Sequence, residues 1–273
     1  MRFVSLRSIR PVLVIGASVI MAAGSFAQRG APAAPTQPAP GLPDVVGLRP
    51  GISAQEAYDF LKARAPKSLI GIGQYPIAGI SDKAVPLAMS VRNFESDPIE
   101  TMTVWLTTPP SKQVVFAVGR KIEYEESKQL LKSTVRAGLL QKYGPELDDQ
   151  GMYWAFDEQG KRMDSANQFS AYCKARANWT LNVHSPEGAT YGFVTPLLMV
   201  PGPANPCDSV VEVRATIDES PNRAYAVGLT VIVSDLALAR RSQEAYQALL
   251  STNATAKQKQ ELEKAKQQKA PDL

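Results

Sequence analysis

Histidine and cysteine are scarce in this chain of 273 residues, which has one histidine, His184, and two cysteines. A single histidine excludes the H-E-x-x-H metalloprotease motif and zinc sites built on several histidines. The chain also lacks G-x-S-x-G, which presents a catalytic serine in α/β-hydrolases, and the C-x-x-C redox motif. We therefore expect a non-catalytic protein without a cofactor or metal, and we interpret His184 as an ordinary strand residue.

An excess of one charge is also missing. The whole chain carries a net charge of +4. Arg2, Arg7 and Arg10 lie in an N-terminal segment that we expect to be removed, which leaves 27 basic against 26 acidic residues. A chain so close to neutrality lacks the overall positive charge that draws proteins to nucleic acids or anionic lipids. We expect no nucleic-acid partner.

The first 27 residues have the organisation of a secretory signal peptide. Basic residues come first, Pro11–Ala27 carries no charge, and Ser25 and Ala27 suit a cleavage site before Gln28. As a helix this uncharged stretch would reach about 26 Å, less than the hydrocarbon core of roughly 30 Å. The alternative is an uncleaved membrane anchor. No cysteine near the cleavage point can accept a lipid, and we expect a periplasmic or secreted protein of a bacterium.

Composition divides the rest of the chain. Residues 28–43 are rich in proline and alanine and are predicted to form a linker. Residues 44–251 are predicted to form a single α+β domain, with a division into two small subdomains near residue 122 as the alternative. Residues 252–273 are rich in Lys, Gln and Glu and lack an apolar face. We expect a polar tail there, helical or disordered.

Three helices are predicted in the domain. Ser53 and Glu56 form a capping box that begins a short helix, which Pro66 limits at its other end. A second helix is expected from about residue 125 to 143, where Gly144 and Pro145 end it. A third is expected over about residues 235–250.

Alternating apolar residues predict strands between these helices. Two are expected near residue 70 and at 87–91, and a hairpin at 101–123. Another strand is expected near residues 152–156, and a second hairpin joins 209–217 to 225–233. Helices separated by hairpins predict an α+β fold, with an antiparallel sheet built from hairpins and three packed helices.

Cys173 and Cys207 are predicted to form a disulfide, because an even pair of cysteines in an oxidising compartment is usually bridged. Closing a loop of about 35 residues would stabilise the fold by roughly 4 kcal/mol. Two buried free thiols are the alternative. The loop would hold Trp179, Tyr191 and Phe193, which we consider candidates for a binding surface, with a place in the core as the alternative.

Carboxylates near Trp154 offer the remaining route to an enzyme. Asp148 and Asp149 precede this residue, and Asp157 and Glu158 follow it. Two carboxylates beside an aromatic side chain are typical of glycosidase sites. Both pairs also stand at predicted turns, where acidic residues serve local hydrogen bonding. An envelope hydrolase is therefore the alternative to a binding protein.

The segment "VVGLRPGISAQEAYDFLKARAP", residues 45–66, resembles the opening of small bacterial envelope modules. These are the β-lactamase-inhibitor-protein-like and outer-membrane assembly lipoprotein modules, and "LLQKYGPE" is similar to the way their helices end. The resemblance implies helices followed by an antiparallel hairpin and a binding or scaffolding role, with no catalytic residues. We expect an exported binding or scaffolding protein whose partner is an envelope protein or a cell-wall component.

Overall fold

The computed structural model describes residues 41–77, 81–147, 151–173, 210–221 and 223–266. The predicted signal peptide, most of the predicted linker and the segment that contains Cys207 lie outside these residues. At the start of the described part, Leu42 already packs against the core.

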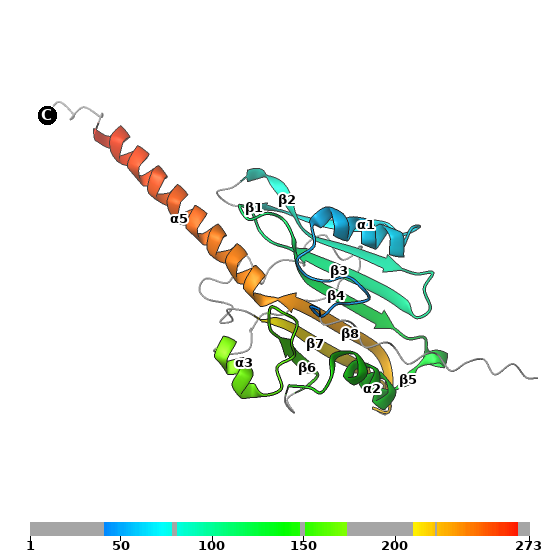
Figure 1. Ribbon diagram of the computed structural model, residues 1–273. Coiled ribbons are helices and arrows are strands. Elements are labelled where there is room, and N and C mark those ends of the chain that lie inside the picture. The colour runs from blue at the N-terminus through cyan, green and yellow to red at the C-terminus, as the bar shows by residue number, and fades with distance from the viewer. Residues whose placement is uncertain (1–40, 78–80, 148–150, 174–209, 222, 267–273) are drawn as a thin grey trace, which may run out of the picture. The chain divides into compact units, whose positions relative to one another are not determined.

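An eight-stranded antiparallel sheet forms the centre of the fold (Figure 1). Its strands are β1 (Ile70–Ile77), β2 (Ser81–Asn93), β3 (Ile99–Leu106), β4 (Val115–Glu123), β5 (Leu130–Leu131), β6 (Tyr153–Phe156), β7 (Val211–Glu219) and β8 (Tyr225–Asp235). Seven of them lie in the order β1-β2-β3-β4-β8-β7-β6, and β5 pairs with the start of β8. The predicted α+β class and the hairpins β3–β4 and β7–β8 are confirmed.

Two sets of strands meet in the middle of this sheet, where β4 pairs with β8 and Ile122 lies opposite Leu229. The set β1 to β4 follows helix α1 (Ala54–Arg64), and the set β6 to β8 follows helix α2 (Lys132–Tyr143). Residue 122 therefore lies on β4, an inner strand of one continuous sheet that is hydrogen-bonded to β3 on one side and to β8 on the other.

Local sequence signals explain where α1 begins and where α2 ends. The hydroxyl of Ser53 accepts the Glu56 amide proton, and the Glu56 side chain accepts the Ser53 amide proton, as the capping box predicts. Gly144 ends α2 with a φ of 83°, a value that suits glycine. Ala57 and Leu61 of α1 are buried against the sheet, whereas Tyr58 is exposed.

Two helices differ from the prediction. The second begins at Lys132 and not near residue 125, because Leu130 and Leu131 pair with β8 instead. Residues Glu126–Lys128 form only a short 3-10 helix, η1. A further helix, α3 (Ala166–Tyr172), begins at Ser165, whose hydroxyl accepts a hydrogen bond from the Gln168 amide.

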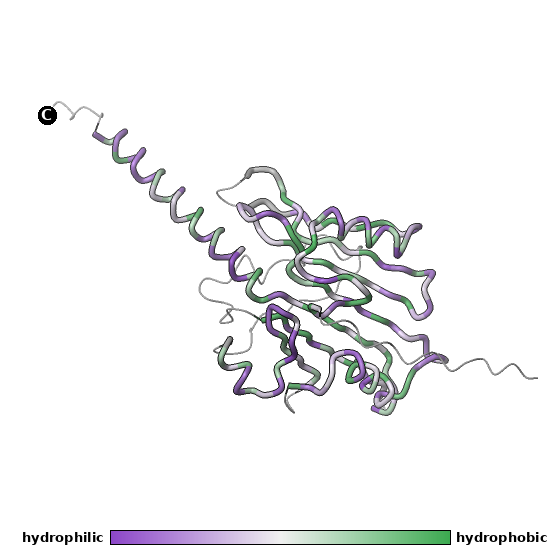
Figure 2. The backbone as a smooth tube through the Cα atoms, viewed as in Figure 1, coloured by the Kyte–Doolittle hydropathy of each residue, from purple (hydrophilic) through white to green (hydrophobic). Residues whose placement is uncertain are grey.

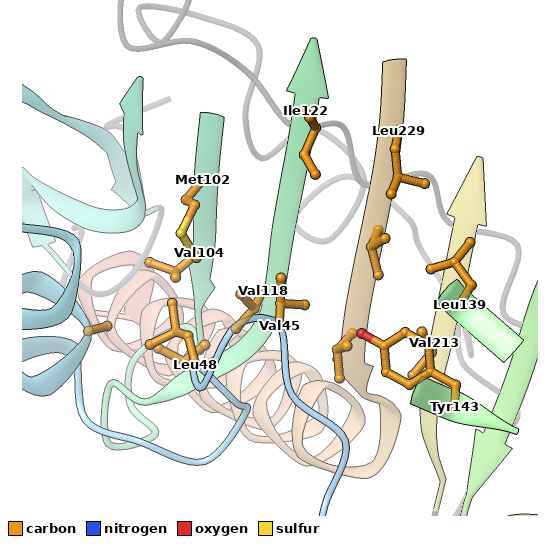
Figure 3. Packing of buried hydrophobic residues seen from close by; sticks show 14 of the residues in the cluster. Val45, Leu48, Met102, Val104, Val118, Ile122, Leu139, Tyr143, Val213 and Leu229 are labelled. Carbon is orange, nitrogen blue, oxygen red and sulfur yellow. The ribbon is translucent and has the colours of Figure 1, made fainter. Parts of the chain in front are cut away.

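One face of the sheet packs against α1, α2 and the segment before α1. Figure 3 shows Met102, Val104 and Val118 on the strands, with Val45 and Leu48 packed over them. Leu139 and Tyr143 of α2 cover the other half of this face and contribute to the same buried cluster. Alternate apolar residues of the strands supply this core, as their period-two pattern predicted.

The opposite face is also buried over much of its area. Its cluster combines Trp105 and Phe116 with residues of α3 and of α5 (Leu236–Lys266). Thr103 and Glu212, which alternate with apolar residues in β3 and β7, are at most 1% exposed on this face. Elements distant in sequence therefore cover this face as well.

Helix α5 is buried only at its beginning. Leu236, Ala239 and Tyr246 belong to the second core cluster. Every residue from 251 to 266 is exposed, and Figure 2 shows this part of the helix without a continuous apolar stripe. The polar tail predicted from residue 252 is therefore helical as far as Lys266.

Candidate interaction surface

The binding-surface residues predicted from the sequence are not described by the structure. Trp179, Tyr191 and Phe193 lie between residues 174 and 209, as do His184 and Cys207. Cys173 is described: it ends α3 and is 1% exposed within the second core cluster. The structure therefore places one end of the predicted disulfide and leaves its pairing a prediction.

Of the described carboxylates near Trp154, Asp157 has a local structural role and Glu158 is exposed. Trp154 is 1% exposed, and its indole N–H donates to the Gly144 carbonyl at 2.7 Å. Asp157 accepts the amide protons of Gln159 and Lys161, which closes a turn. Because this tryptophan lies in the core, it presents no aromatic surface to a sugar. Asp148 and Asp149 lie outside the described residues.

Among the residues that the structure describes, no three His, Cys, Asp or Glu side chains gather as metal ligands would. No helix among them is long and apolar enough to cross a membrane.

Two large apolar side chains stand out on the described surface. Leu69 is 86% exposed and Phe94 is 60% exposed, the highest values for large hydrophobic side chains in the described chain. The strand register sets Ile70 opposite Val91, so Leu69 comes across from Arg92, and Phe94 follows Arg92 by two residues along the chain. We call Leu69, Arg92 and Phe94 the Leu69–Phe94 surface.

Arg92 connects the apolar part of this surface to its charges. Its guanidinium lies 4.9 Å from the centre of the Phe94 ring and 2.7 Å from a Glu123 carboxylate oxygen. Lys121 approaches the same carboxylate at 3.2 Å. Stacked arginine and aromatic side chains are favoured at the centres of protein interfaces, and polar pairs at the rim.

The turn after β2 holds Phe94 in place. Asn93 accepts the Glu95 amide proton through its side chain and the Ser96 hydroxyl proton through its carbonyl. The Asn93 side chain also donates to the Arg64 carbonyl at the end of α1, at 3.3 Å. On the solvent side, Lys67 pairs with Glu95 at 2.9 Å. These contacts tie the turn to the end of α1 and to the segment between α1 and β1, so the surface is pre-organised.

A buried ion cluster fixes α1 on the face of the sheet opposite Arg92. Glu100 accepts hydrogen bonds from Arg64 at the end of α1 and from Arg120 on β4. Burial raises the pKa of Glu100, but the hydrogen bond from Arg64 and the charge of Arg120 lower it by more. The pKa of Glu100 therefore lies below its ordinary value. The carboxylate therefore stays ionised and holds the helix against the sheet.

The sequence contains a signal for this surface that the predicted strands do not include. Leu69 and Phe94 stand at the two ends of the segment in which two strands are predicted. Each is a large apolar residue among polar neighbours, in "PKSLI" and "RNFESDP". Apolar residues at strand ends are often buried, so only the three-dimensional arrangement shows that both remain exposed next to Arg92.

Comparison with known protein families, curated proteins and solved structures finds no match to this chain. The resemblance of residues 45–66 to envelope modules therefore stays a prediction.

Proposed function

We propose that this chain is an exported, non-catalytic binding or scaffolding protein of the bacterial envelope, and that its Leu69–Phe94 surface contacts a partner protein. Residues 1–27 support export through their signal-peptide organisation. The observation that carries the proposal is the exposure of Leu69 and Phe94, both next to Arg92, whose guanidinium lies over the Phe94 ring. This chemistry favours a protein partner over a cell-wall glycan.

The test is site-specific photocrosslinking in the native bacterium. A photoreactive phenylalanine analogue at position 94 should form one dominant adduct with an envelope protein, whereas the same analogue at position 262 should not. Leu262 is a matched control because it is 57% exposed on α5. The substitution Phe94→Ser should abolish capture of that protein from envelope extract, and Leu262→Ser should leave it unchanged.

Equal adducts at both positions, or capture that does not depend on Phe94, would contradict the proposal. Because Phe94 is largely exposed, Phe94→Ser should change the free energy of unfolding by less than about 0.5 kcal/mol. A thermal unfolding curve identical to that of the unsubstituted protein confirms that the variant tests binding and not folding.

A Cys173–Cys207 disulfide belongs to the same proposal. It is supported by the predicted export and by the burial of Cys173 at the end of α3. Such a bridge would connect α3 to the chain that enters β7 at Val211.

A further inference from the structure

The two outer strands of the sheet, β6 and β1, differ in whether described residues pair with their outer edges. β6, at one end, has only four residues, and the chain that follows folds back along it. Met163 donates its amide proton to the Ala155 carbonyl, and Arg162 forms a β-bridge with Phe156. The edge of β6 is thus covered by the protein itself.

β1, at the other end, pairs with β2 on one side, and no described residue pairs with its other side. An open edge presents unpaired N–H and C=O groups that can hydrogen-bond another strand. In the order of the sheet in Figure 1, β1 is the outermost strand of the half that carries the Leu69–Phe94 surface.

Natural proteins protect open edges with charged side chains, prolines or bulges. The second half of β1 has such protection, with Pro76 and register shifts at Gly73/Gln74 and Tyr75/Ile77. Residues 69–73, Leu-Ile-Gly-Ile-Gly, contain neither charge nor proline. Ile72 is 44% exposed in this stretch, which begins at the exposed Leu69.

We propose that residues 69–73 accept an extended segment of a partner protein as an added strand. This inference rests on the proposed function, because Leu69 belongs to both surfaces. The register places Ile70 and Ile72 on the face of Val91 and Met89, so the added strand should carry apolar side chains on that face. Gly71 and Gly73 bear no side chain, so larger residues of the partner can lie over them.

A second copy of this chain is a weaker occupant. Five paired residues share a ladder of only about 17 Å, and stable dimers usually bury at least about 1,200 Å². A different protein can pair with this edge and also cover Phe94, which lies beyond the first residue of β1, Ile70. The segment that we assign to the edge is therefore uncharged, apolar at alternate positions and part of another protein.

The experiment selects octapeptides from a display library on the mature protein and maps the best synthetic binder by amide hydrogen exchange. We expect alternating apolar sequences whose binding slows exchange at residues 69–73. Ile72→Lys places a charge on the edge and should weaken the binder at least about tenfold, whereas Leu262→Lys should not.

Three outcomes would overturn the added strand. The library yields no binder, the protected amides lie elsewhere, or protection of 69–73 appears without peptide as the protein dimerises. A binder that depends on Phe94 but leaves residues 69–73 unprotected would retain the proposed function and remove only the strand addition. Failure of photocrosslinking at position 94 tests the proposed function separately.

Discussion

Two carboxylates are buried in the described part of this fold. Glu100 and Glu212 are 5% and 1% exposed. Glu100 is held by two arginines, and Glu212 accepts hydrogen bonds from Tyr153 and Arg214. A buried carboxylate is costly unless it is paired and hydrogen-bonded, and removing it leaves its partners without a counter-charge.

Glu100→Gln should destabilise the protein by about 2 kcal/mol, because Arg64 and Arg120 lose their shared counter-charge while remaining partly buried. Chemical denaturation at pH 7 measures this loss. Glu95→Gln is the matched control: the Lys67–Glu95 pair is exposed on both sides, so its loss should cost less than about 0.5 kcal/mol. Equal effects of the two substitutions would contradict a structural role for the Glu100 cluster.

The lowered pKa of Glu100 also predicts that the protein loses stability in acid. The folded pKa of Glu100 is lowered, so the unfolded chain binds more protons just below an ordinary glutamate pKa of about 4.3. Its contribution to stability is complete above about pH 5 and is lost as the pH falls through the lowered pKa. Glu100→Gln should flatten this part of the stability–pH curve, whereas a curve parallel to that of the unsubstituted protein would contradict the assignment.

Asp235 should change the stability with pH in the direction opposite to Glu100. Burial raises the pKa of Asp235, and the charge of Glu158 adds to the rise. The Asp235 carboxylate also caps α5, where it accepts the Leu238 amide proton at 2.7 Å. The folded state therefore holds its proton more tightly, and stability falls as the pH rises through the raised pKa. Asp235→Asn keeps the cap without the charge and should preserve stability at pH 7 within about 0.5 kcal/mol, whereas Asp235→Ala should cost about 1 kcal/mol. Equal losses in both variants, measured by denaturation, would show that the charge itself is needed.

At the scale of elements, pairing and capping decide the boundaries more than propensity does. The residues before α2 suit a helix, yet Leu130 and Leu131 join the sheet beside Tyr225 and Ala226. By contrast, α5 continues to Lys266 although nothing packs against its second half among the described residues. Strand pairing shortened one helix, and the other follows its local sequence preference.

Deleting residues 254–273 should leave the melting temperature within about 2 °C, because the removed part of α5 buries no side chain. Leu262, its single large apolar residue, is exposed. A longer deletion that begins at Tyr246 is the control, since this buried side chain belongs to the second core cluster and its loss should cost about 3 kcal/mol. A large drop with the shorter deletion would show that the tail contacts the domain.

At the scale of the molecule, the sheet has helices on both faces and one protected edge. α1 and α2 cover the first face, while α3 and the start of α5 contribute to the second cluster. The chain leaves the described part at Cys173 and returns at Val210, and both residues are buried in that second cluster. A covalent connection between these points would limit the freedom of the unfolded chain.

We expect Cys173 and Cys207 to be bridged in protein purified from the periplasm. Mass spectrometry of unreduced peptides should find the linked pair, and alkylation in denaturant should modify neither cysteine before reduction. Reduction should lower the stability by roughly 4 kcal/mol on the chain-entropy model. Two cysteines that alkylate without reduction would contradict the bridge. The variant Ser90→Ala keeps both cysteines and, carried through the same purification and alkylation, serves as the control for sample handling.

The sequence by itself determined those features that depend on neighbouring residues. The capping box at Ser53, the end of α2 at Gly144 and the alternating strands of both hairpins follow from local hydrogen bonding and period-two patterns. These signals were sufficient for the α+β class and for the antiparallel sheet.

Only the tertiary structure decided which faces are covered and which side chains stay exposed. Glu212 and Thr103 alternate with apolar residues as solvent-facing positions do, yet they are buried by elements distant in sequence. Leu69 and Phe94 are apolar, yet they remain exposed because β1 is an edge strand and Phe94 lies in a turn. Burial depends on which elements meet in space, and the order of neighbouring residues does not encode that.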